Sequence, residues 1–103
     1  MKFITDGEFN LKAAKLQFGD KPMRIMANNR VAITIREGDK PRKVDYCHDW
    51  NDAGLLAVME GISIIYHSKF NMWEASKGDI EAVNYSPTKA ITLCYLKMNG
   101  VDV

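Results

Sequence analysis

The chain has 103 residues and a mass of 11.7 kDa, which fits one domain with a hydrophobic core of its own. Hydrophobic residues make up 47% of the sequence and charged residues 26%, which excludes a disordered chain, and no apolar run is long enough to span a membrane. Lys and Arg number 14 against 13 Asp and Glu, a balance that argues against a protein working chiefly by neutralising nucleic-acid phosphates. The first residues contain no apolar signal region, and we expect a cytoplasmic protein with two free thiols.

A helix over residues 6–18 is the best marked element of the sequence. Thr5 and Glu8 have the spacing of a capping box, in which each residue satisfies a main-chain donor of the other. Apolar residues recur every three to four positions from Phe9 onward, as one face of a helix requires. Gly19 then provides the stop signal.

A β-hairpin is predicted after this helix, with strands at residues 23–27 and 30–36. The second strand alternates apolar with less apolar side chains, which is typical of a half-buried strand. Residues 28–29 are both Asn, which tolerates the positive φ of a tight turn. Residues 36–43 are charged and contain Gly and Pro, so we expect an exposed loop before a third strand at residues 43–46.

The middle of the chain predicts a second helix followed by two strands. Asp49 is positioned to cap a helix over residues 50–60, and Gly61 stops it. Residues 62–66 are rich in residues that favour strands and are apolar on both faces, which favours a central strand. Residues 72–75 form a short final strand.

The last helix begins at Ser86 as N-cap with Pro87 at its first position, and it ends at Gly100. Its buried side includes Cys94. The resulting order, α-β-β-β-α-β-β-α, predicts an α+β fold in which three helices pack on one small antiparallel sheet.

Residues 46–52 form the densest polar and aromatic segment. A cysteine beside a histidine suggests a nucleophile, but neighbouring residues of a strand point to opposite faces, so Cys47 and His48 are not expected to contact each other. The alternative is structural: Cys47 is buried, Asp49 is a cap and Trp50 belongs to the core. No spaced metal-ligand pairs and no phosphate-loop or nucleophile-elbow motif occur, and we expect no enzymatic activity, no metal and no cofactor.

A second candidate site lies at the start of the last helix. Free main-chain donors, two hydroxyls and Lys89 could bind a carboxylate or a phosphate there. The structural alternative is that Ser86 only caps the helix and Lys89 is solvated. Trp73 is more typical of a core or an interface than of catalysis. Arg42 belongs to a charged loop that is either solvated or a rim contact for an acidic partner.

Three short motifs follow one another along the chain: residues 8–14, residues 45–53 continuing to 61–64, and residues 72–75 followed by 86–90. Their order and spacing resemble the NinX-like family of small proteins of tailed bacteriophages. The chain departs from the family pattern at His48 and Asp49. It also has Ser86 and Lys89 where the family has Asn and Arg, which keeps a cap and a positive charge.

The resemblance implies a phage-encoded accessory protein of the infected host's cytoplasm, with counter-defence as the expected role. We expect it to sequester a nucleotide-type immune signal of the host. The alternatives are a protein–protein inhibitor of a host defence or regulatory enzyme, and a nucleic-acid-associated protein. A homodimer is the default assembly. The residues expected to contact a ligand are Tyr46, His48, Trp50, Trp73, Ser86, Thr88, Lys89 and Arg42.

Overall fold

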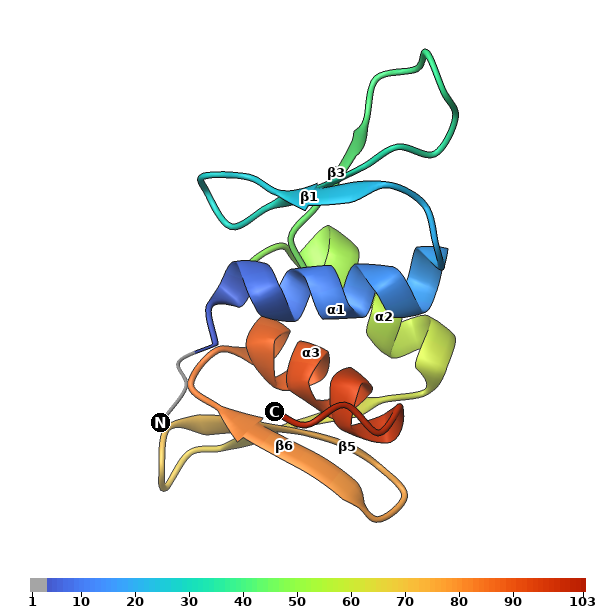
Figure 1. The fold of residues 1–103 in the computed structure, drawn as a ribbon. Helices are drawn as coiled ribbons and strands as arrows, with labels where there is room; N and C mark the ends of the chain where they lie inside the picture. The colour runs from blue at the N-terminus through green and yellow to red at the C-terminus, as the bar shows by residue number, and fades with distance from the viewer. Residues whose placement is uncertain (1–3) are drawn as a thin grey trace. The chain divides into compact units, whose positions relative to one another are not determined.

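The computed structural model describes residues 4–103, on which it places three helices and two three-stranded antiparallel sheets (Figure 1). This confirms the α+β class, but the order is α-β-β-β-α-β-β-β-α, with one strand more than predicted. The chain divides into two compact parts, up to Asp45 and from Tyr46 onward. The expectation of a single domain stays a prediction. The expected absence of a signal segment involves residues 1–3, which lie outside the described residues.

No helix in the described part of the chain is both long and apolar enough to cross a membrane.

The first part begins with helix α1 (Asp6–Phe18), as predicted. The Thr5 hydroxyl accepts the Glu8 main-chain N–H at 3.2 Å, which satisfies one of the free donors of the first turn. Gly19, with a φ of 70°, ends the helix, and its N–H donates to the Lys15 carbonyl.

Three short strands follow in the order β1-β2-β3: β1 (Met23–Ile25), β2 (Val31–Ile33) and β3 (Arg42–Val44). Asn29 has a φ of 66°, which confirms the tight turn between the first two. The prediction of a half-buried second strand is wrong, because all three residues of β2 are buried. Helix α1 packs against β1 and β2, and Ala32, at the centre of β2, pairs with Arg24 on one side and Lys43 on the other.

The hairpin turn is fixed to α1 by buried polar contacts. The Asn10 side-chain amide, which is fully buried, donates to the Asn29 carbonyl at 2.9 Å and to an Asp45 carboxylate oxygen at 2.8 Å. The Gly7 N–H donates to the Asn29 side chain at 3.2 Å. A Cβ at Gly7 would lie 2.7 Å from the Ile25 Cγ2, so only glycine permits this approach of helix and hairpin.

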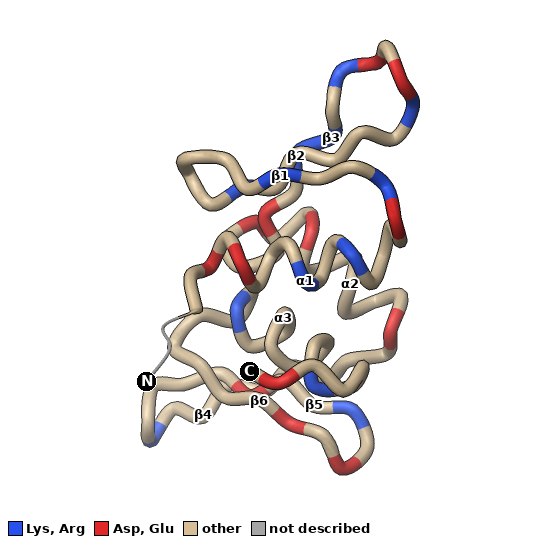
Figure 2. Tube along the Cα trace, in the orientation of Figure 1, with Lys and Arg blue, Asp and Glu red and all other residues tan. Residues whose placement is uncertain are grey.

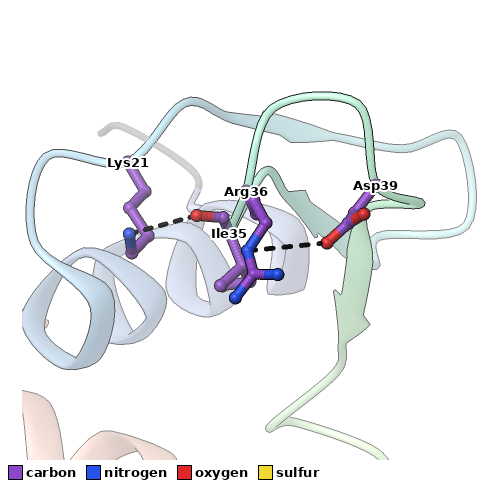
Figure 3. Close-up of polar contacts among 4 residues, drawn as sticks. All are labelled: Lys21, Ile35, Arg36 and Asp39. Atoms are coloured by element: carbon purple, nitrogen blue, oxygen red, sulfur yellow. Dashed lines mark hydrogen bonds and ion pairs between the residues drawn. The ribbon is translucent and has the colours of Figure 1, made fainter.

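The loop between β2 and β3 is exposed, as predicted, and local contacts shape it (Figure 3). The Lys21 ammonium donates to the Ile35 carbonyl at 3.2 Å. Arg36 lies 4.0 Å from Asp39, but both side chains are largely exposed, so this ion pair contributes little to stability.

The second part contains helices α2 (Trp50–Glu60) and α3 (Pro87–Met98), both with the predicted caps. The Asp49 carboxylate accepts the Asn51 N–H at 2.8 Å, and Ser86 caps α3 with Pro87 in its first turn. Helix α2 packs against α3 through its buried residues, Ala53 and Leu56.

The second sheet has the order β4-β5-β6, with β4 (Ser63–His67), β5 (Met72–Lys77) and β6 (Ile80–Asn84). Helix α3 covers β5 and β6 (Figure 1), with the paired Ala75 and Ala82 buried beneath it. The predicted central strand at residues 62–66 is instead the edge strand β4. The sequence prediction ended the sheet at residue 75 and missed the turn at Gly78, whose φ of 59° returns the chain as β6.

Candidate functional site

The start of α3 carries a chain of hydroxyl groups. The buried Thr88 donates its hydroxyl proton to the Cys47 carbonyl at 2.5 Å. Since Thr88 has a single hydroxyl proton, the Ser86 hydroxyl is the donor in the 2.9 Å contact between the two. The Ser86 oxygen in turn accepts the Lys89 N–H at 3.4 Å. These hydroxyls therefore attach the turn that contains Cys47 to the first turn of α3.

Two main-chain donors at the same place are also engaged. Pro87 has no N–H, and the Ser86 N–H donates to the Asn84 side chain at 3.0 Å. The Lys89 N–H is taken by the cap. The predicted anion site therefore has fewer open donors than the sequence suggests. That site stays a prediction.

The predicted aromatic contacts are distributed over different environments. Tyr46 is only 1% exposed and cannot stack on a ligand at the surface. Trp73 is half-buried and packs on Tyr66, with ring centroids 4.9 Å apart. Trp50, expected in the core, is 53% exposed, which corrects that prediction. Trp50 is the first residue of α2, and the buried residues of the helix, Ala53 and Leu56, lie further along it.

The two remaining predicted contacts differ in their surroundings. Arg42 is the first residue of β3 in the first compact part, and its guanidinium lies 5.3 Å from the centre of the Phe18 ring. Arg42 was predicted to lie in the charged loop. This prediction is wrong, because Arg42 begins the strand that follows the loop. His48 is exposed in the turn before α2.

Both cysteines are free and fully buried. Burial raises the pKa of the Cys94 thiol, and the positive charges of Lys97 and Lys77 offset this only in part. A buried thiol with a raised pKa is protonated at neutral pH and is a poor nucleophile. Among residues 4–103, no group of three or more His, Cys, Asp or Glu side chains is placed to hold a metal ion.

One surface that the sequence interpretation missed is the exposed side of α2. We define the α2 apolar face as Trp50, Leu55, Val58 and Met59, which are 53%, 49%, 81% and 61% exposed. These residues fall on one half of the helix, and the Trp50 ring lies beside Gly54. The sequence does contain a signal for this surface: α2 has apolar residues on both of its sides, a pattern that is typical of a helix buried on both sides.

Charge is unequally divided between the two parts of the chain (Figure 2). Residues 1–45 contain ten Lys and Arg against six Asp and Glu, whereas residues 46–103 contain four against seven. Within residues 49–60, which include α2, the charged side chains are all acidic: Asp49, Asp52 and Glu60. A partner of this face is therefore expected to be neutral or basic at its rim.

A small hollow lies on the outer face of the first sheet and has a volume of about 140 Å³. It is lined by Pro22, Met23, Arg24, Ala32, Thr34 and Pro41. None of the predicted ligand contacts lines it, and it is smaller than the roughly 300 Å³ at which small-molecule sites begin.

No protein-family model matches this chain, and no curated protein or solved structure does so either. The resemblance to NinX-like phage proteins therefore stays a prediction from three motifs, and the functional inference depends on the geometry described above.

Proposed function

We propose that this chain is a non-enzymatic binding protein that docks on another protein through the α2 apolar face. The observation that carries the proposal is the exposure of four large apolar side chains on one side of a regular helix. In the setting that the NinX-like motifs suggest, the partner is a host defence or regulatory enzyme in the cytoplasm of an infected bacterium.

The spacing of the face matches helix-in-groove recognition. Leu55, Val58 and Met59 stand at i, i+3 and i+4, so they form one stripe that a groove can accept. Trp50, one turn further toward the N-terminus, supplies an aromatic anchor of the type that dominates protein interfaces. Full burial of an exposed side chain of this size contributes roughly 1.5–3 kcal/mol, and covering these partly exposed side chains contributes the corresponding part of it.

The acidic residues around the face define the partner's chemistry more closely. Asp49 and Asp52 lie at the start of α2 and Glu60 at its end, with no Lys or Arg in residues 49–60. The complementary surface is an apolar groove with Lys or Arg at its rim, because opposite charges at the rim speed association and exclude wrong partners.

The test compares Val58→Lys with Phe70→Lys. Val58 is 81% exposed and Phe70 is 65% exposed outside any helix, so both variants are expected to fold and carry the same added charge. Proteins retained by the wild-type chain from host lysate are identified, purified and titrated against all three forms. We expect Val58→Lys to weaken binding at least about tenfold and Phe70→Lys to leave it unchanged. A partner that binds both variants equally would refute the proposed face.

Sequestration of a nucleotide-type signal is a second candidate, supported by one contact. Trp73 on β5 pairs with Asn84 on β6, and the Asn84 side chain accepts the Ser86 N–H. Asn84 therefore links the strand position of an aromatic residue to the start of α3. A panel of cyclic and ADP-ribose-type nucleotides titrated into the wild-type chain and into Val58→Lys separates the two functions. Equal nucleotide binding by both forms would support sequestration instead of protein docking.

A further inference from the structure

The two sheets present four edge strands, and three of them are protected against pairing with another chain. β1 and β3 have only three residues each, with Arg24 and Lys43 at their centres, so pairing with a second copy would bring like charges together. β6 carries Glu81, whose carbonyl already accepts the Lys97 ammonium at 2.9 Å.

β4 is different in each of these respects. It has five residues, Ser63–His67, with no Lys, Arg, Asp, Glu or Pro among them. Within residues 4–103 its strand partner is β5 alone, so its outer edge presents a row of main-chain donors and acceptors to solvent. Ile65 and Tyr66 are 49% and 44% exposed. Long, apolar and uncharged edges of this kind are templates for strand addition.

We propose that β4 pairs antiparallel with β4 of a second copy of the chain, which joins two three-stranded sheets into one six-stranded sheet. In an antiparallel pair, two residues that face each other direct their main-chain groups either both toward the partner strand or both away from it. Because this direction alternates along a strand, the twofold axis of such a pair passes through a residue rather than between two. An axis at Ile65 uses all five residues. It places Ile65 opposite the partner's Ile65 and Ile64 opposite the partner's Tyr66.

The register makes a second copy a better occupant than an unrelated strand. The central pairs of this register join apolar side chains. Each His67 faces the partner's Ser63, so the two imidazoles lie at opposite ends of the paired strands and do not meet. Glu74, the neighbour of Ile65 on β5, is separated from the partner's Glu74 by three strand spacings, about 14 Å. That distance exceeds the Debye length of roughly 8 Å at physiological salt, so the two carboxylates scarcely repel each other.

The sheet offers a matched pair of positions for the test. Ile65 and Val83 both flank Glu74 in the same cross-strand row, on opposite edges, and are 49% and 44% exposed. Sedimentation equilibrium is measured at roughly 10 to 500 µM, where interfaces below the standard size associate. We expect the wild type and Val83→Lys to dimerise and Ile65→Lys to stay monomeric. A wild-type monomer throughout this range, or equal dimerisation of both variants, overturns the proposal.

Cross-linking gives an independent measurement if Ile65→Lys fails to fold. Opposed residues of antiparallel strands have Cα atoms about 4.5–5.5 Å apart, within the span of a disulfide or a short thiol cross-linker. Ile65→Cys is therefore expected to form a covalent dimer in the folded state, whereas Val83→Cys and the wild type, whose own cysteines are fully buried, are not. Equal cross-linking of Ile65→Cys and Val83→Cys would refute the twofold axis at Ile65. Val58→Lys should leave the dimer intact, which separates this surface from the α2 apolar face.

Discussion

Replacing Thr88 with valine perturbs the hydroxyl chain that attaches the turn at Cys47 to α3. Valine keeps the branched shape at a position that is 4% exposed, so packing changes little. What is lost is the donor to the Cys47 carbonyl at 2.5 Å and the acceptor of the Ser86 hydroxyl at 2.9 Å.

The two losses have different costs. The bond from Thr88 to the Cys47 carbonyl is buried, and losing a buried hydrogen bond of this kind costs roughly 1–3 kcal/mol. Ser86 is half-buried and can turn its hydroxyl proton toward water, so this second loss adds little. We expect Thr88→Val to lower the free energy of unfolding by about 2 kcal/mol. Ser86→Ala removes only the cap and should cost about 1 kcal/mol.

Urea unfolding followed by tryptophan fluorescence measures both changes. Trp50 and Trp73, the two tryptophans of the chain, lie in residues 46–103, so the signal reports the part that contains the hydroxyl chain. The double variant should lose less than the sum, because Ser86 no longer has Thr88 as a partner. If Thr88→Val is destabilised by less than Ser86→Ala, the assignment of Thr88 as donor to the Cys47 carbonyl is wrong.

Two further predictions concern stability. Gly7→Ala should destabilise the first part of the chain, although alanine favours helices, because the new Cβ would lie 2.7 Å from the Ile25 Cγ2 and 2.9 Å from the Asn29 Oδ1; a melting temperature by circular dichroism equal to wild type or higher would contradict this. Burial raises the pKa of Cys94 above 9.0 and that of Tyr95 above 10.0, so the native state holds these protons more tightly than the unfolded chain. The urea midpoint should be constant at neutral pH and fall as the pH rises above about 9, and a rise there would show the sign to be wrong.

The helices were predictable because their ends are encoded locally. Thr5, Asp49 and Ser86 each accept a main-chain N–H within the next three residues, so neighbouring sequence alone identifies them. Gly19 and Gly61, with φ values of 70° and 67°, mark two of the C-termini in the same local way. No knowledge of the rest of the fold is needed for signals of this kind.

The strands were less predictable because their burial depends on distant partners. Ala32 is a solvent-facing position in an alternating pattern, yet it is only 4% exposed in the central strand of its sheet, between Arg24 and Lys43 of the neighbouring strands. Residues 62–66 were predicted as a central strand because they are apolar on both faces. Their position at the edge follows from Gly78, which returns the chain on the other side of β5 and leaves β4 with one neighbour.

The two apolar elements whose burial was overestimated are also the two to which we assign partners. Trp50 was expected in the core and Ile65 in a central strand, and both are about half exposed in the folded chain. A hydrophobic pattern records that a side chain is buried in the working protein, but it does not record which chain covers it. A residue that its pattern assigns to the interior and the fold leaves at the surface is therefore a place to look for an interface, and Trp50 of α2 and Ile65 of β4 meet that condition.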